Sequence, residues 1–252
     1  MSKGVGCVLA IALVLSETDA LGAASPTDPA AILKAADAPY ESFSEGTILL
    51  RAVVNDRGKK PATNLLELFV KGTEKSLCVF REGKQQGKKI LTLGDKVWLI
   101  VPGASRPVPV SKTQRLMGAA SFGDIARLRF ADEYVATVRP EEESLAGDDQ
   151  TTRCRVLDLA AKRKGAAYSK AVLWVGVSDG LARRLRLSLA SGKEAKDVRF
   201  VRYDGERRLA RMEIQDLLTA GGTNVTVLDF ESYEKRPLDP AVFDLEGARA
   251  VP

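Results

Sequence analysis

The feature that most constrains the fold is a succession of short β-prone runs separated by turn residues. About a dozen such runs follow one another from Thr47 onward. The predicted strands are Thr47–Val54, Asn64–Val70, Ser76–Arg81, Lys88–Leu93, Lys96–Val101, Phe130–Val138, Arg153–Leu159, Ala171–Val177, Ala182–Leu189, Val198–Tyr203, Arg208–Asp216 and Val225–Tyr233. Most connections are short, and short connections place consecutive strands antiparallel. The sequence therefore predicts a mainly antiparallel β protein.

The alternation of side chains indicates two different sheet faces. Leu185, Leu187 and Leu189 fall on one face of their predicted strand, whereas Arg184 and Arg186 fall on the other. A sheet of about a dozen strands does not stay flat, because strand twist makes it curl, split or close. Where such a sheet curls without closing, its apolar face becomes a concave face that needs a cover.

Little helical material is available to cover that face. Asp28 is a good helix cap and Pro29 suits the first helical position, so we expect a helix over Ala30–Asp37 that Pro39 ends. Two further helical segments are expected at Ser121–Leu128 and Pro240–Leu245. Such short helices can form a lid over an apolar cavity without filling it. A barrel or sandwich packed solid by its own side chains is the open alternative.

The N-terminus has the pattern of an export signal. Lys3 is followed by an apolar run over Val5–Leu15 and by small residues up to Ala24. That run is too short to span a bilayer. We expect residues 1–24 to be a signal peptide and residues 25–252 to form a single domain. The alternative, a buried N-terminal helix, lacks capping residues.

Two cysteines remain in the expected mature chain, Cys78 and Cys154. Cys7 lies at the start of the apolar run rather than after it, so we expect a soluble mature protein without a lipid anchor. An oxidising compartment would permit a disulfide between Cys78 and Cys154. Two unrelated buried thiols are the equally open alternative.

The absence of histidine weakens most enzyme hypotheses. Histidine is the commonest general base and metal ligand, and the chain contains none. Ser232 and Lys235 have the spacing of a serine nucleophile motif, but the companion motifs are missing. The acidic run Glu141–Glu143 lacks the glycine spacing of a calcium loop, so we expect it to be a solvated loop. We expect no enzyme activity, no metal and no cofactor.

Basic residues cluster at 162–164, 183–186 and 207–211, and the formal net charge is +5. Aromatic residues make up only 6% of the chain. Nucleic-acid binding favours interleaved aromatic side chains, so nucleic acid is not an expected partner. Peripheral contact with an anionic membrane and simple solubilisation of the wet sheet face both remain open.

An ordered set of short motifs resembles a known family. The motifs are Gly87-x-x-Ile90-Leu91, Gly94-Asp95-x-x-Trp98-Leu99-x-x-Pro102, Gln114-Arg115-Leu116-Met117-Gly118-x-x-Ser121-x-Gly123-Asp124, Asp132-x-Tyr134, Leu157-x-Leu159-x-Ala161, Tyr168-x-Lys170 and Leu173-Trp174-Val175. Together they resemble the LolA-like superfamily of bacterial outer-membrane lipoprotein-sorting proteins. The resemblance covers nearly all of the expected mature chain.

The resemblance implies a half-barrel with a helical lid that shields acyl chains of lipoproteins or lipids as they cross the periplasm. It also implies an inner-membrane donor and an outer-membrane acceptor. An RseB-like envelope sensor or protein-interaction module of the same fold is the alternative. In well-known carriers an arginine on a strand holds the lid shut. Arg51 is the candidate here, and a solvated strand arginine is its alternative role.

We expect the binding cavity to be lined by two residues that share a strand face, Trp98 and Ile100, and by Leu116, Met117 and Phe122 of the lid-like segment. Ordinary core packing of these five residues is the alternative. Gln114 and Arg115 precede that segment, and no strand requires a mixed basic and apolar loop there. We therefore expect lid motion or partner contact at Gln114 and Arg115.

Overall fold

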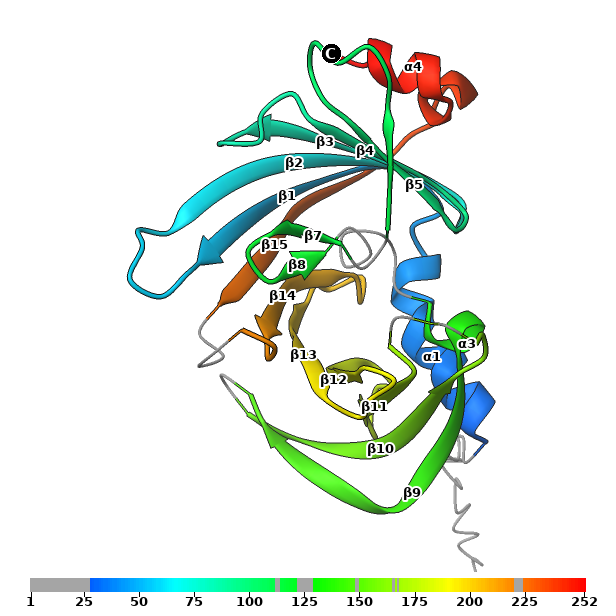
Figure 1. Ribbon diagram of the computed structural model, residues 1–252. Coiled ribbons are helices and arrows are strands. Elements are labelled where there is room, and N and C mark those ends of the chain that lie inside the picture. Colours follow the sequence, from blue (N-terminus) through cyan, green and yellow to red (C-terminus); the bar gives the residue numbers. More distant parts are fainter. Residues whose placement is uncertain are drawn as a thin grey trace, which may run out of the picture.

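The computed structural model describes residues 28–252 except 112–113, 122–128, 148–149, 165, 167 and 220–223, and for Tyr40 and Arg115 only the backbone is described. Its main element is a single antiparallel sheet of thirteen strands (Figure 1). The strands are β1 (Glu45–Asn55), β2 (Ala62–Lys71), β3 (Lys75–Glu82), β4 (Lys89–Leu93), β5 (Lys96–Ile100), β6 (Val108–Val110), β9 (Tyr134–Ala146), β10 (Thr151–Ala161), β11 (Lys170–Gly176), β12 (Ala182–Ser188), β13 (Glu194–Tyr203), β14 (Leu209–Asp216) and β15 (Val225–Lys235).

The order of the strands makes the sheet an open, curled half-barrel. The order is β6-β5-β4-β3-β2-β1-β15-β14-β13-β12-β11-β10-β9, so β6 and β9 are its two edges. Pairing of β1 with β15 joins the N-terminal strands to the C-terminal ones. Figure 1 shows the sheet curving around a concave side. The predicted fold class is confirmed, and each predicted strand has a counterpart.

The helix α1 (Pro29–Glu41) lies on the concave side together with α3 (Phe130–Glu133) (Figure 1). It begins as predicted, because the Asp28 carboxylate accepts hydrogen bonds from the backbone N–H groups of residues 30 and 31. The predicted end at Asp37 is wrong, since the helix continues through Pro39. Ser42 caps the added turn by donating its backbone N–H to Ala38 and its hydroxyl to Pro39.

The predicted strand Phe130–Val138 is wrong over its first four residues, which form α3. The reason is a long-range cap: the two carboxylate oxygens of Asp37 accept the backbone N–H groups of Phe130 and Ala131, each at 2.8 Å. These two bonds satisfy N–H groups that the first turn of a helix leaves free. The contact also fixes α1 to α3. Local β-propensity at Phe130 is therefore overridden by a residue 93 positions away.

The acidic run Glu141–Glu143, expected as a loop, is instead part of β9, which extends to Ala146. Backbone pairing with β10 extends the strand, since Glu142 and Glu143 lie opposite Arg155 and Cys154 in the ladder. An exposed ion pair accompanies it, with Glu142 2.6 Å from Arg153. β9 is an edge strand, so the missing N–H of Pro140 removes no bond from a central ladder.

The C-terminal helices η1 (Pro240–Phe243) and α4 (Leu245–Ala250) cover the convex face of β3, β4 and β5, not the concave mouth (Figure 1). Phe243 and Ala248 form a separate apolar cluster with Leu77 and Leu91. Lys89 secures this segment by donating to the carbonyl oxygen of Arg249 at 2.7 Å. The expectation that Pro240–Leu245 contributes to the lid is therefore wrong.

The Asp37 cap predicts a pH-dependent stability. Burial raises the pKa of the Asp37 carboxyl from 3.8 to about 6, against the opposing effect of its two N–H donors. The folded protein therefore binds more protons than the unfolded chain between these values. Its free energy of unfolding should fall as pH rises from 4 to 7, by up to about 3 kcal/mol from this group.

Urea denaturation of the wild type and of Asp37→Asn at several pH values between 4 and 7 measures this effect. The variant has no carboxyl at this position, so the difference between the two proteins should change over this range. Parallel stability curves would show that Asp37 titrates normally.

Candidate functional site

The concave face of the sheet carries the largest apolar cluster of the protein. Nearly every strand contributes buried side chains to it, among them Ile48, Leu50, Leu66, Leu68, Phe80, Ile90, Leu157, Leu173, Leu185, Phe200, Met212 and Leu228. Along each strand these residues occur at every second position, so they all project from one side of the sheet. This surface extends continuously over the strands on both sides of the β1–β15 pair.

In the described part of the chain, three short segments cover this surface. α1 contributes Ile32 and Leu33, and α3 contributes Phe130, which packs edge-on against Phe200. The third segment is a hairpin formed by β7 (Arg115–Met117) and β8 (Ala120–Ser121), which pair only with each other. The cover leaves a set of apolar side chains only partly buried at the margin of the cluster: Val54, Leu99, Val110 and Leu116.

Polar side chains on the concave face contact the hairpin. The hydroxyl of Thr226 accepts the backbone N–H of Ala119 at 2.9 Å, and the ammonium of Lys196 donates to the Ser121 hydroxyl at 3.0 Å. The amide of Asn64 lies 3.8 Å from the Met117 sulfur. These contacts come from β15, β13 and β2, so the hairpin bridges several strands.

The sequence interpretation did not identify these polar anchors, although a signal was present. Thr226 has the same strand parity as the buried Leu228, and Lys196 has the same parity as the buried Val198. Polar residues at inward-facing positions are uncommon, because an apolar surface does not satisfy them. Such a mismatch indicates a position that receives another polar group.

Ion pairs join the turns of the β2–β5 region to residues next to α3 and β10, on the other side of the half-barrel. The β2–β3 and β4–β5 turns are held together by a backbone bond from Gly94 to Glu74, which places Glu74 close to Asp95. Arg129, directly before α3, lies 2.7 Å from Glu74, and Arg163, after β10, bonds to both carboxylate oxygens of Asp95. Both pairs are partly or fully exposed, so their contribution to stability is small and salt-sensitive.

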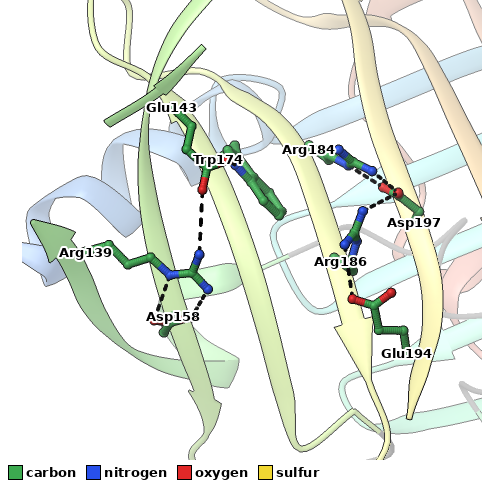
Figure 2. A network of polar contacts seen from close by, with 8 residues as sticks. All are labelled: Arg139, Glu143, Asp158, Trp174, Arg184, Arg186, Glu194 and Asp197. Atoms are coloured by element: carbon green, nitrogen blue, oxygen red, sulfur yellow. Dashed lines mark hydrogen bonds and ion pairs between the residues drawn. The ribbon is translucent and has the colours of Figure 1, made fainter. Parts of the chain in front are cut away.

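The convex face is charged where the concave face is apolar. Figure 2 shows the network on β9 to β13. Trp174 is 6% exposed, donates its indole N–H to Glu143 at 2.8 Å and lies beneath the guanidinium groups of Arg184 and Arg186. Both arginines bond to Asp197, and this hydrogen bond raises the pKa of Arg184.

Most arginines of the predicted basic clusters are ion-paired, whereas Arg207 donates to the backbone carbonyl of Asp179. The pairs are Arg183 with Asp179, Arg184 with Asp197, Arg186 with Glu194, Arg208 with Asp204 and Arg211 with Asp229. Pairing reduces the positive potential that would attract an anionic membrane. It favours the alternative in which these residues solubilise the outer face of the sheet.

The structure does not bring the five predicted cavity residues together. Trp98 and Ile100 belong to the convex cluster beneath the C-terminal helices, so the prediction is wrong for these two residues. The reason is parity, since their neighbours Val97 and Leu99 face the concave cluster. The sequence correctly indicated that Trp98 and Ile100 share a face, but periodicity could not tell which face is concave.

The other predicted residues lie in or next to the hairpin. Met117 is buried in the concave cluster and Leu116 packs against it. Phe122 lies outside the described residues, as does most of the expected helix at 121–128. Gln114 is exposed directly before β7, and Arg115 is the first residue of β7.

Arg51 does not contact a lid. Its side chain projects from β1 away from the concave cluster, because Leu50 and Ala52 take the inward positions. It forms an ion pair with Glu231 on β15 at 2.6 Å. The solvated strand arginine is the role that the structure supports.

Cys78 and Cys154 are free, buried thiols, so no disulfide joins them. They lie on β3 and β10, and β2, β1, β15, β14, β13, β12 and β11 separate these strands in the sheet. They also belong to different apolar clusters. Burial raises the pKa of Cys78 to about 12 and that of Cys154 to about 11, so both thiols are poor nucleophiles.

Within the described ranges, histidine, cysteine and carboxylate side chains form no group of three that could hold a metal ion. In the same part of the chain, no helix has the length and apolar character needed to cross a membrane.

Fold and site together define a half-barrel binding scaffold, apolar within and charged outside. The model of a protein family described as uncharacterized protein matches residues 72–247, more than half of the chain. A LolA superfamily protein from Nitrosomonas europaea is 27% identical, with a TM-score of 0.76 over 88% of this chain and 99% of that chain. The chain belongs to the LolA-like superfamily.

Two other crystal structures share the fold. A domain described as that of an outer membrane lipoprotein-sorting protein, from Vibrio parahaemolyticus, is 16% identical, with a TM-score of 0.73 over 88% of this chain and 98% of that chain. A DUF1329 family protein from Desulfovibrio piger is 23% identical, with a TM-score of 0.71 over 87% of this chain and 99% of that chain. Comparison with curated proteins gave no match.

The convex network predicts unequal effects for two acidic residues that contact the same arginine. The Asp197 side chain is 8% exposed and serves both Arg184 and Arg186, whereas that of Glu194 is 50% exposed. Asp197→Ala should lower the free energy of unfolding by about 2 to 3 kcal/mol, because the partly buried guanidinium of Arg184 loses its carboxylate partner and that of Arg186 loses one of two. Glu194→Ala should lower it by less than about 0.5 kcal/mol. Urea denaturation measures both, and equal effects would contradict this assignment.

Proposed function

We propose that this chain is a carrier that shields the acyl chains of lipoproteins or lipids on the concave face of its half-barrel, in the periplasm of a bacterium. The single observation that carries the proposal is the continuous apolar concave surface, covered only by α1, α3 and the β7–β8 hairpin in the described part of the chain. Membership of the LolA-like superfamily supports it.

The size of the hydrophobic effect makes a carrier without chemistry sufficient. Removing each methylene from water contributes about 0.8 kcal/mol, so a chain of about sixteen carbons gains on the order of 13 kcal/mol. An apolar surface supplies this transfer without a nucleophile, a metal or a cofactor. We therefore propose a binding protein and not an enzyme.

Directional transport requires a donor and an acceptor. A carrier of this affinity releases its ligand only when a better acceptor or a change of conformation shifts the equilibrium. An inner-membrane donor and an outer-membrane acceptor would meet this need, and removal of a signal peptide over residues 1–24 would place the domain between them. An RseB-like sensor of the same fold is the second candidate, and the name of the Vibrio relative, which refers to lipoprotein sorting, favours the carrier.

Titration with a fluorescent acyl chain tests the proposal. The purified protein should bind such a probe, and Leu99→Arg should weaken binding by about tenfold or more, because a charge at this half-buried concave position opposes burial of the chain. Val135→Arg is the matched control. Val135 is 59% exposed on β9, whose neighbouring residues Tyr134 and Ala136 take the inward positions.

The control should bind as the wild type does. Circular dichroism and the midpoint of thermal unfolding establish that both variants are folded. No binding by the wild type, or equal loss in the two variants, would contradict the carrier function.

A further inference from the structure

The β7–β8 hairpin is held in a different way from every strand around it. The thirteen strands of the main sheet are joined by continuous backbone ladders, whereas β7 and β8 pair only with each other. Met117, Ala119 and Ala120 are nonetheless at most 5% exposed, so the hairpin is inserted deeply against the concave face. It occupies apolar surface without being part of the sheet that supplies it.

The surface beneath the hairpin is amphipathic. Val54 and Ile214 flank Thr226 on the neighbouring strands, and both project inward. Thr226, Asn64 and Lys196 add a hydroxyl, an amide and an ammonium group to this apolar setting. A pure hydrocarbon would offer the Thr226 hydroxyl and the Asn64 amide no hydrogen-bond partner. Asn64, Thr226 and Lys196 lie on strands that β1 and β14 separate, so a carbonyl group next to an acyl chain would bond to one of them.

The hairpin gives the side chain of Asn64 poor hydrogen-bond partners. Asn64 is 4% exposed, its amide nitrogen reaches only the thioether of Met117 at 3.8 Å, and its side-chain oxygen has no hydrogen-bond partner. Sulfur is a weak acceptor. A carbonyl oxygen in place of this sulfur would form a stronger bond with the amide nitrogen. The contact between Asn64 and Met117 is therefore the weakest polar contact between the hairpin and the sheet.

We propose that the surface beneath the β7–β8 hairpin is the binding site for the ester or amide end of an acylated ligand, and that the hairpin is a self-ligand which leaves when the acylated ligand binds. This inference rests on the proposed carrier function and locates its site. In the free protein the hairpin keeps the concave face out of water. In the complex the bound ligand covers the concave face instead, so the apolar surface is exposed to water in neither the free nor the bound protein.

Gly118, at the tip of the hairpin, shows how closely the hairpin fits. Its φ is +51°, and a Cβ added there would lie 2.4 Å from the Thr226 hydroxyl and 2.6 Å from a methyl of Val54. Alanine at this position would force the hairpin away from the sheet. Gly192 supplies the matched control, because its φ is +83° but no atom lies within 4 Å of an added Cβ.

Thiol labelling measures displacement of the hairpin directly. The native thiols Cys78 and Cys154 are buried, and burial raises the pKa of each, so they give little background. Ala120→Cys places a thiol on the hairpin at a fully buried position, and Ala182→Cys places one at a fully buried position of the sheet. An N-palmitoyl peptide is the acyl amide probe.

Saturating probe should increase the rate of maleimide labelling of Ala120→Cys by about tenfold or more and leave that of Ala182→Cys unchanged. Gly118→Ala should bind the probe about five- to tenfold more tightly than the wild type, since the competing hairpin is weakened, whereas Gly192→Ala should bind as the wild type does. A diacyl phospholipid tested in parallel shows whether the ester end is accepted as well as the amide.

The outcomes separate the two proposals. If the probe binds but labelling of Ala120→Cys does not change, the hairpin stays in place and this inference is wrong, while the carrier function stands. Equal affinity of the Gly118→Ala and Gly192→Ala proteins has the same meaning. If the wild type and Gly118→Ala both fail to bind the acyl probe, the carrier function falls and the inference falls with it.

Discussion

The rest of this structure depends on one constraint: an open antiparallel sheet of thirteen strands has a concave apolar face that water must not reach. Closure into a barrel would remove the edges, but β6 and β9 remain the ends of the sheet. The chain instead covers the face with short segments, fixed by a few polar contacts such as the Asp37 cap on α3 and the Thr226 contact with the hairpin. A cover made of short segments outside the main sheet is consistent with the proposed reversible binding of an acyl chain.

The opposite, convex face of the sheet is stabilised in a different way. There Trp174 lies beneath two arginines, and the arginines in turn share Asp197. Every partner in this arrangement is supplied by the sheet itself. Farther along, the convex surface of β3 to β5 is covered by η1 and α4, which Lys89 holds through the carbonyl of Arg249. The two faces of the sheet therefore differ in how permanently they are covered.

Most of the fold could be predicted from the sequence, because strand alternation and turn residues are local signals. The segments that were mispredicted depend on contacts outside the segment: Asp37 turns Phe130–Glu133 into a helix, and backbone pairing with β10 keeps Glu142 and Glu143 in a strand. The candidate site was harder to predict than the fold. Periodicity grouped Trp98 with Ile100 but could not say which face curls inward, since Leu99 is equally apolar. The motif Gln114–Gly118 was noted because no predicted strand required it, but the β7–β8 hairpin was not predicted. The polar anchors of the hairpin lie on strands whose sequences look ordinary.

The central claim is that the concave face receives an acyl chain. Native mass spectrometry of the protein, purified without detergent from its own cells, tests it most directly. The account predicts a fraction of the protein with an added mass that organic extraction releases and that fragmentation identifies as an acylated molecule. A protein that carries no such mass after gentle purification, and that acquires none when mixed with N-palmitoyl peptide, would contradict it.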